Sequence, residues 1–209
     1  MKLILISPSG KIDSEIHFLI NMFERGLPTY HLRKIKFSTR QLKEFISEIP
    51  PKYHNRIVIH THHELALKFN LKGIYISRSH KKRKLRLWLR LKWFKFKKEN
   101  LRISSTYKSI EAIMHINRDY DYVFLTPAFD SNSGNFQAGF TENNLKSALK
   151  NTNRKIIARG GVSVDNIAKA KELGFAGVAF YSNIWKKENP LKEFIKVTEK
   201  FAELNLPME

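Results

Sequence analysis

The chain has 209 residues, enough for one sizeable hydrophobic core, and no linker rich in proline, glycine or serine divides it, so we expect a single domain over residues 1–209. The absence of cysteine excludes disulfides, thiolate chemistry and thiolate metal sites. The formal net charge of +19 points to nucleic acid or another polyanion, and the lack of a signal peptide or a membrane-length apolar run predicts a cytoplasmic protein.

One unit repeats along the chain, an apolar run typical of a strand followed by a segment with the apolar spacing of a helix. The runs are continuously apolar, as expected of strands that are buried on both faces. They are KLILISP (2–8), TYHLRKI (29–35), RIVIHT (56–61), GIYISR (73–78), LRISST (101–106), DYVFLTP (121–127), KIIARGG (155–161) and GVAFYSN (177–183).

Three of the intervening helical segments carry clear terminal signals. Ser38 and Gln41 form a capping-box pattern before the second helix. Gly174 is a typical C-terminal stop for the helix before the last strand. Asn189 followed by Pro190 predicts the start of the final helix.

Residues 81–98 (KKRKLRLWLRLKWFKFKK) contain ten cations and no acidic residue. From Lys84 to Trp93 basic and apolar residues alternate with a near period of two, and then the register slips. A strand, an amphipathic surface segment and an extension that folds on binding all fit this pattern. The segment is either a solvated basic face with its apolar side on the body of the protein, or a contact for nucleic acid or an anionic membrane.

Eight strand–helix units predict an α/β fold, a single compact (β/α)8 TIM barrel with this basic insertion after strand four; an open doubly wound sheet is the alternative. Active sites of such barrels lie at the C-terminal ends of the strands. Gly160 and Gly161 allow backbone N–H groups to approach an anion after strand seven, and Ser182 and Asn183 follow strand eight. These four residues predict a phosphate-binding cup.

Several blocks, in this order, resemble the thiamine phosphate synthase / thiazole tautomerase family: YHLRK (30–34), SSTYKSIEA (104–112), DYVFLTPAFDSNSG (121–134), ARGGVSVDNI (158–167) and GFAGVAFYSNIW (174–185). The family consists of (β/α)8 barrels. Its synthase joins hydroxymethylpyrimidine diphosphate to thiazole phosphate with Mg²⁺, giving thiamine phosphate and pyrophosphate. The resemblance therefore implies a transferase with phosphorylated small-molecule substrates and Mg²⁺ as cofactor.

The resemblance assigns roles unevenly around the second strand. Arg33 matches the family's diphosphate-binding arginine, and His31 stands where the family has glutamine. The lysine two residues after the arginine is replaced by Ile35, with Lys34 or Lys36 as substitutes.

In the thiazole-phosphate loop, Ser131 and Ser133 match the family's hydroxyl residues, but Gly134 stands in place of its lysine. The phosphate cup predicted above matches the family at its two glycines and its serine.

His60, Thr61 and His62 occupy the place of the family's Asn-Asp-Arg motif. Thr61 and His80 stand at the two positions where the family has the carboxylates that hold Mg²⁺. Both substitutions disfavour the metal, because Mg²⁺ prefers carboxylate and water oxygens. The histidine that serves as acid and base in the tautomerase branch is Tyr107.

Three hypotheses follow. The first is a divergent thiamine phosphate synthase, with Arg33, His31 and His60 as catalytic residues and Ser105 and Tyr107 lining the ring pocket.

The second is a barrel that binds a phosphorylated small molecule without this reaction. His31, His60 and His80 would then hold a transition metal such as Zn²⁺ or act as acid and base groups. The third hypothesis, compatible with both, is contact with a polyanion or an anionic membrane surface through residues 81–98. The sequence leaves assembly into a homo-oligomer open.

Overall fold

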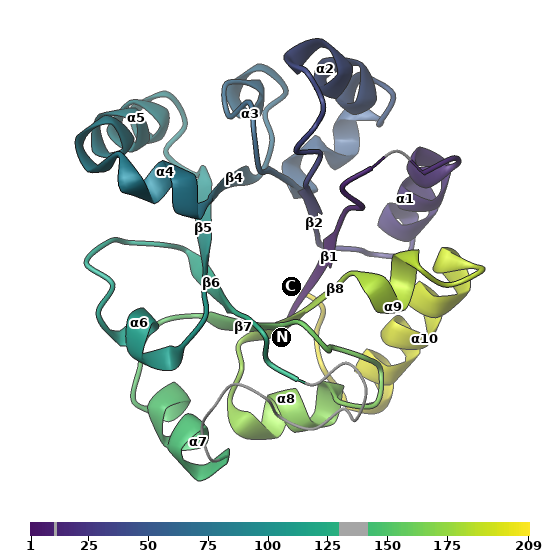
Figure 1. Cartoon of the computed structure of the whole chain (residues 1–209). Coiled ribbons are helices and arrows are strands. Elements are labelled where there is room, and N and C mark those ends of the chain that lie inside the picture. The colour runs from purple at the N-terminus through teal and green to yellow at the C-terminus, as the bar shows by residue number, and fades with distance from the viewer. Residues whose placement is uncertain (11, 130–141) are drawn as a thin grey trace.

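A computed structural model describes residues 1–10, 12–129 and 142–209, and within them eight parallel strands close into a barrel (Figure 1). Each strand pairs with its neighbours in the chain, and β1 pairs with β8 to close the ring. The predicted (β/α)8 barrel is confirmed. The strands are β1 (Lys2–Ile6), β2 (Thr29–Leu32), β3 (Ile57–Ile59), β4 (Gly73–Ile76), β5 (Arg102–Tyr107), β6 (Tyr122–Leu125), β7 (Ile156–Arg159) and β8 (Gly177–Phe180).

Helices surround the barrel on its outside (Figure 1). They are α1 (Glu15–Glu24), α2 (Thr39–Ser47), the 3-10 helix η1 (Pro51–Arg56), α3 (Leu65–Lys68), α4 (Arg78–Lys82), α5 (Lys84–Lys97), α6 (Ile110–Met114), α7 (Glu142–Lys150), α8 (Ile167–Leu173), α9 (Ser182–Trp185) and α10 (Pro190–Glu203). None of the helices in the described part of the chain is long and apolar enough to cross a membrane.

The terminal signals read from the sequence begin and end these helices as predicted. Ser38 and Gln41 form a reciprocal capping box at the start of α2. Gly174 ends α8 with a φ of 95°, in the left-handed region that glycine adopts without steric cost. The side chain of Asn189 accepts a hydrogen bond at the start of α10, which continues with Pro190.

The strands bury both faces, and alternate residues serve two different cores. One set faces the helices and belongs to the main hydrophobic core. The other fills the barrel itself, and its apolar members are Ile4, Ile6, Tyr122, Phe124, Ile157 and Ala179. Because registered residues on neighbouring parallel strands point to the same side, this interior set identifies which polar residues also face inward.

The basic segment 81–98 is helical over most of its length, since α5 spans Lys84–Lys97. The near-period-two alternation is typical of a strand, but Leu87 and Phe94 are buried in the main core and Leu91 packs against it. These positions, i, i+4 and i+7, form one helical stripe. Of the three conformations that the pattern allows, the structure has the amphipathic surface segment, packed on the barrel beside β4 and β5 (Figure 1).

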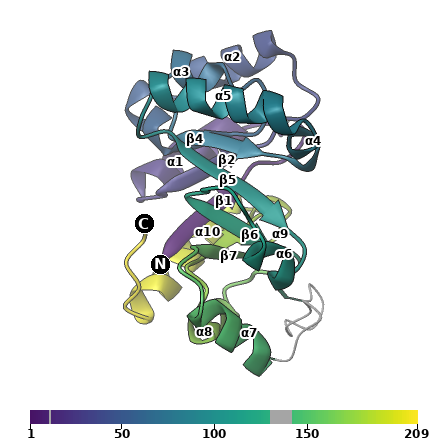
Figure 2. The same cartoon turned by 90° about the vertical axis from the view of Figure 1, so that its left-hand side faces the viewer.

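The two ends of the barrel are distinct. Helices α4 and α9, which follow β4 and β8 almost directly, lie at one end, and both chain termini lie at the other (Figure 2). The terminal ammonium of Met1 donates a hydrogen bond to the carbonyl of Pro207 at 2.8 Å. The end with α4 and α9 is therefore the C-terminal end of the strands, and we call it the mouth.

Candidate active site

Two histidines and two tyrosines form a cluster inside the barrel, near its mouth. His31 is in register with Ile6, an interior residue, so its imidazole points inward. Its Nδ1 lies 3.0 Å from Nε2 of His60, and its Nε2 lies 2.6 Å from the hydroxyl oxygen of Tyr122. The ring of His60 stacks on that of Tyr75, with the centroids 4.0 Å apart. His31 and His60, predicted as site residues after neighbouring strands, are therefore in direct contact.

Both imidazoles are neutral near pH 7. Burial is the largest cause, and it lowers the pKa of His31 and of His60 well below the usual value. The positive charge of Arg159 lowers both pKa values further, and that of Arg33 also lowers the pKa of His60. A neutral imidazole has one N–H and one free nitrogen, so the two histidines share an N–H···N bond without carrying charge.

Arg159 places a second guanidinium in this space. It is the last residue of β7, and its register with Ala179 turns it inward. Its Nη1 donates to Oγ1 of Thr106 at 3.4 Å, and its guanidinium lies 5.7 Å from the centre of the Phe124 ring. Burial lowers the pKa of Arg159, and the charge of Arg33 lowers it further. Among the described residues, no carboxylate changes this pKa, and the only group that raises it is Tyr75.

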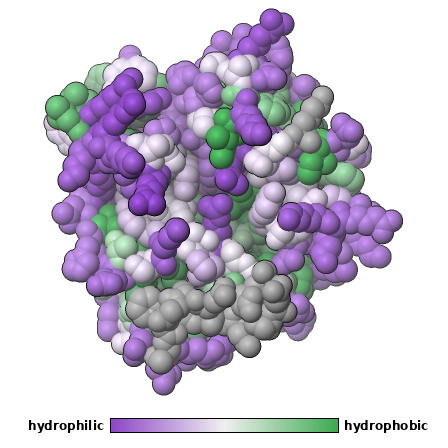
Figure 3. Space-filling view, viewed as in Figure 1, coloured by the Kyte–Doolittle hydropathy of each residue, from purple (hydrophilic) through white to green (hydrophobic). Residues whose placement is uncertain are grey.

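The glycine turn after β7 has the backbone that the predicted phosphate cup requires. Gly160 and Gly161 have φ values of 86° and 67°. Ser182 is the first residue of α9, where backbone N–H groups have no partner within the helix. The side-chain amide of Asn183 donates to the carbonyl of Val162 at 2.6 Å, so it fastens α9 to this turn. Figure 3 looks onto the mouth, where polar groups surround the centre of the face.

Ser105 and Tyr107 do not line the barrel interior, contrary to the prediction. Ser105 is fully buried, and its hydroxyl donates to the carbonyl of Ile76 at 2.8 Å. In the β5–β6 register these two residues pair with Val123 and Leu125, which belong to the outer core.

The phenol ring of Tyr107 lies instead under Nζ of Lys81, 3.5 Å from its centroid. Ser104 and Thr106, one position earlier on β5 in each case, pair with the interior residues Tyr122 and Phe124. A shift of one residue along a strand exchanges its two faces, which explains the error.

His80 does not join the other two histidines. Its Nδ1 accepts a hydrogen bond from the backbone N–H of Ser77 at 3.2 Å, and its ring lies 4.8 Å from that of His63. His63 is itself buried, and burial, followed by the charge of His80, lowers its pKa to about 3. Within residues 1–10, 12–129 and 142–209, no group of three or more His, Cys, Asp or Glu side chains could hold a metal ion. His31, His60 and His80 therefore do not form the Zn²⁺ site that the second hypothesis allowed.

The donors at the two family positions for Mg²⁺ do not suit that ion. Oγ1 of Thr61 is a buried, neutral oxygen with no hydrogen-bond partner among the described residues. His80 offers an imidazole whose Nδ1 is already used by Ser77. Mg²⁺ is a hard cation that takes carboxylate and water oxygens in an octahedral shell.

The two lysines after β2, Lys34 and Lys36, differ in burial. Lys34 is fully buried, and its ammonium binds the carboxylate of Glu15 and the carbonyl of Gly10. It therefore cannot replace the missing family lysine. Lys36 is exposed and stays a prediction. Ser131 and Ser133, predicted for the thiazole-phosphate loop, lie outside the described residues.

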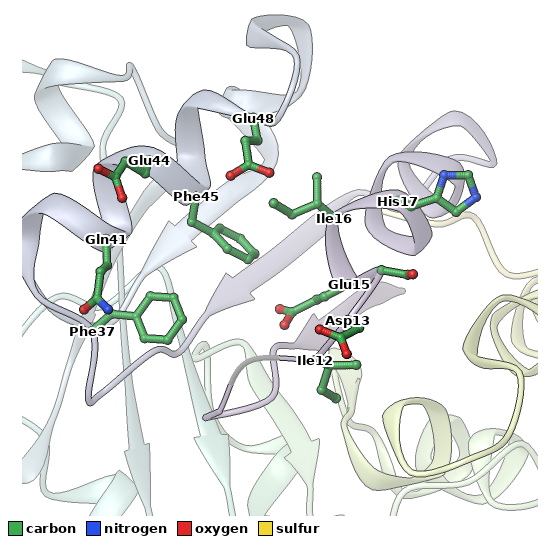
Figure 4. Close-up of a pocket in the computed structure, with 11 residues that line it drawn as sticks. Ile12, Asp13, Glu15, Ile16, His17, Phe37, Gln41, Glu44, Phe45 and Glu48 are labelled. Carbon is green, nitrogen blue, oxygen red and sulfur yellow. The ribbon is translucent and has the colours of Figure 1, made fainter.

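A separate pocket of about 510 Å³ lies between α1 and α2 (Figure 4). The carboxylates of Asp13, Glu15, Glu44 and Glu48 line it, together with apolar and other polar side chains. None of the predicted site residues is among those that line it. Its negative charge opposes a phosphate ligand, so the mouth is the better candidate for a phosphorylated substrate.

Sequence reasoning missed three inward residues, Tyr75, Tyr122 and Arg159. All lie within the strand runs that the sequence identifies, and Arg159 immediately precedes the glycine pair. The signal that could have found them is the period of two within each strand, counted from the inward position of His31 or Ile6. A continuously apolar strand hides this period, because both of its faces are buried.

Comparisons with known proteins agree on one family. The family profile described as thiamine monophosphate synthase matches residues 3–184. A thiamine-phosphate synthase of Clostridium tetani is 27% identical over 182 residues, covering 85% of this chain and 84% of the relative. The crystal structure of a thiamine phosphate pyrophosphorylase from Bacteroides thetaiotaomicron superimposes with a TM-score of 0.77 at 26% identity, over 99% of this chain and 100% of that one. A thiamine phosphate pyrophosphorylase from Pyrococcus furiosus, 17% identical, shares the fold with a TM-score of 0.75 over 97% of this chain and 96% of its own.

Proposed function

The chain belongs to the thiamine monophosphate synthase family, and from this premise we propose that it is a transferase that couples hydroxymethylpyrimidine diphosphate with thiazole phosphate. In this reaction the bond from the pyrimidine methylene carbon to the diphosphate oxygen breaks, and the thiazole nitrogen forms a bond to the same carbon. The products are thiamine phosphate and pyrophosphate. The protein must stabilise the negative charge that develops on the leaving group.

The observation that carries the proposal is the pair of guanidinium groups, Arg33 and Arg159, at the mouth. Each lies close enough to His60 to lower its pKa, and Arg33 also lowers the pKa of Arg159. Without a ligand the two cations repel each other inside a partly desolvated site. A diphosphate would relieve this repulsion and accept hydrogen bonds from both forks.

The second phosphate, that of the thiazole, fits the glycine turn. Gly160 and Gly161 present backbone N–H groups without side chains in the way, and the first turn of α9 adds further N–H donors at Ser182 and Asn183. Arg159 immediately precedes this turn, so the diphosphate and the thiazole phosphate would lie on either side of the C-terminal end of β7. This separation suits two substrates whose rings meet over the barrel interior.

We assign the two histidines different roles: His31 orients His60, and His60 offers a neutral ring to the substrate. His31 is fully buried and touches His60 and Tyr122, so it orients His60 and does not itself contact substrate. This narrows the role predicted for it to a positioning residue. His60 is stacked on Tyr75, and its contact with His31 uses Nε2, which leaves Nδ1 for a ligand. A neutral donor there can bind the pyrimidine without adding to the positive charge of the arginines.

Mg²⁺, when bound in the family, neutralises the diphosphate. The neutral oxygen of Thr61 and the imidazole of His80 do not fit it, and we derive no step through the metal. Arg159 supplies positive charge inside the barrel instead.

The alternative is a barrel that binds phosphorylated small molecules without coupling them. The same unfit metal donors favour it, because a guanidinium does not bridge two phosphate groups as a metal ion does. The two functions differ in turnover but not in phosphate binding.

The test is thiamine phosphate formation from the two substrates, measured fluorometrically after oxidation to thiochrome. We expect Arg33→Ala and Arg159→Met each to lower kcat by about 10²–10³-fold, the usual cost of removing one donor to a developing anion. Arg25→Ala, at an exposed position after α1, is the matched control and should keep full activity.

Full activity of Arg159→Met would contradict the role given to the guanidinium pair. A wild-type protein that binds thiazole phosphate in calorimetry, yet forms no product with or without Mg²⁺, would establish the alternative.

A further inference from the structure

Helix α5 exposes an unusual amount of apolar surface. Seven large apolar side chains are exposed in the described part of the chain, and five of them lie on this one helix. Their exposed fractions are 71% for Leu85, 48% for Trp88, 55% for Leu89, 49% for Trp93 and 84% for Phe96. Single exposed apolar residues are ordinary, but a contiguous group on one element marks an interaction surface.

The apolar residues of α5 form two stripes on opposite faces. At about 100° per residue, the buried residues point to the barrel and the exposed ones point almost directly away from it. We call the second set the outward stripe; it consists of Leu85, Leu89, Trp93 and Phe96. The helix is anchored from within by its buried stripe, so the outward stripe is held on a rigid support.

Cations border the outward stripe on both sides. Helical geometry places Lys84 and Lys95 along one edge and Arg86, Arg90 and Lys97 along the other. Among the described residues, the ion pair between Arg90 and Glu64 at 3.6 Å is the only one that residues 81–98 make. Lys81 and Lys98, at the two ends of the segment, donate hydrogen bonds to other parts of the protein. The cations that border the outward stripe, apart from Arg90, form no ion pair within the described residues and can meet an external anion.

A pocket of about 330 Å³ lies beside the stripe, where α4 meets α5. Its lining includes the three arginines Arg83, Arg86 and Arg90, together with Ser79 and His80. This lining can hold a phosphate group by several charge-assisted hydrogen bonds. In Figure 3, apolar groups lie among charged ones at the edge of the molecule over α5.

We propose that α5 docks the protein on an anionic phospholipid surface, with the outward stripe in the lipid interface, the flanking cations at the headgroups and one lipid phosphate in the arginine pocket. This arrangement, apolar residues along one line with basic residues on either side, is that of a helix lying in a membrane interface. Nucleic acid explains the cations and the aromatic rings, but not the leucines at the centre of the stripe. A second copy of the chain, packed by a two-fold axis, would set ten cations against ten without an acid. The proposal does not depend on the reaction in the barrel.

Tryptophan fluorescence provides a direct readout with the full-length protein. The chain has three tryptophans, and Trp185 is only 5% exposed, so a change on lipid binding reports Trp88 and Trp93. We expect vesicles of phosphatidylcholine with phosphatidylglycerol to shift the emission to the blue and to co-sediment the protein. Vesicles of phosphatidylcholine alone should do neither.

Two matched pairs of variants test the two parts of the surface. Leu89→Ser with Phe96→Ser should lower the vesicle affinity at least tenfold, whereas Met114→Ser, at a residue 47% exposed on α6, should leave it unchanged.

Arg83→Glu with Arg86→Glu should also lower the vesicle affinity at least tenfold, since one basic residue near an anionic surface contributes about fivefold. Lys43→Glu with Lys192→Glu makes the same change in net charge at exposed sites on α2 and α10, and should have a smaller effect. Thiamine phosphate formation should be equal in the wild type and in the Leu89→Ser/Phe96→Ser, Met114→Ser and Lys43→Glu/Lys192→Glu variants, because none of these residues lies at the mouth.

Three results would overturn the proposal. Equal binding to neutral and anionic vesicles would remove the role of the cations. Binding to a polynucleotide without binding to vesicles, unaffected by the serine substitutions, would assign α5 to nucleic acid. A dimer in light scattering that dissociates when the outward stripe is replaced, without vesicle binding, would assign it to a second copy of the chain.

Discussion

Phe94 and Phe96 lie two positions apart on α5 and give a sharp test of its orientation. In a strand, residues i and i+2 share a face, so both rings would be buried or both exposed. In the helix they differ by about 200°, and their exposed fractions are 1% and 84%.

Replacing Phe94 by Ala removes a fully buried ring and should cost about 3–5 kcal/mol of unfolding free energy. Phe96 buries roughly 30 Å² of its ring, worth about 0.8 kcal/mol at 25 cal/mol per Å², and the better helix propensity of Ala offsets about half of this.

The measurement is urea-induced unfolding of the wild type and the two single variants, followed by far-UV circular dichroism. With a denaturant slope of about 2–3 kcal/mol per molar, Phe94→Ala should move the midpoint down by about 1–2.5 M and Phe96→Ala by less than about 0.3 M. Equal losses in the two variants would refute the helical orientation, and with it the outward stripe. A large loss for Phe96→Ala alone would mean that the helix is rotated.

Two further predictions concern the barrel interior. The pKa values of His31 and His60 in the folded protein lie well below 6.5, so below pH 6.5 the unfolded chain binds more protons than the folded one. The free energy of unfolding should therefore fall as the pH drops from 7 to 5, by up to about 2 kcal/mol per histidine. His31→Gln should flatten this dependence in chemical denaturation at each pH, whereas His17→Gln, on the exposed side of α1, should leave it unchanged. Gly160→Ala and Gly26→Ala each place a Cβ at a positive φ, of 86° and 92°, and should each cost about 1–2 kcal/mol. The new Cβ would lie 3.2 Å from atoms that follow β6 in Gly160→Ala, whereas the nearest atom in Gly26→Ala would be 3.5 Å away. Only Gly160→Ala should therefore also lose affinity for thiazole phosphate, measured by calorimetry. Equal affinity in the two variants would argue against the predicted phosphate cup.

The fold was predictable because its signals are local. Eight continuously apolar runs, each followed by a helical pattern, predict parallel strands buried on both faces, and eight such units predict closure. The capping box at Ser38, the helix stop at Gly174 and the Asn189–Pro190 start act within one turn of the chain, so they can be read from neighbouring letters. The contact between His31 and His60 follows in the same way, because strands that are consecutive in a barrel lie side by side.

The sequence predicted at which strand ends the site lies, but not which side chains there face the barrel interior. Ser105 was expected in the ring pocket, but Ser104 and Thr106 face inward, since a strand apolar on both faces does not show its register in the sequence. Lys34 was a candidate for the mouth, yet it lies buried against Glu15 from α1.

The sequence by itself determined that this chain is a barrel with a glycine turn after its seventh strand and a cation after its second, because these features depend on short-range patterns. Only the tertiary structure decided which way each side chain turns. In the sequence, nothing but its place before Gly160 and Gly161 distinguishes Arg159. The register of β7 with β8 turns its side chain into the barrel, where it adds a second cation to Arg33. The basic segment alternates like a strand, and it became a helix because Leu87, Leu91 and Phe94 can reach the barrel together only at helical spacing. That packing leaves the outward stripe of α5 exposed, since the side of a helix opposite its buried face has only solvent or a partner to meet.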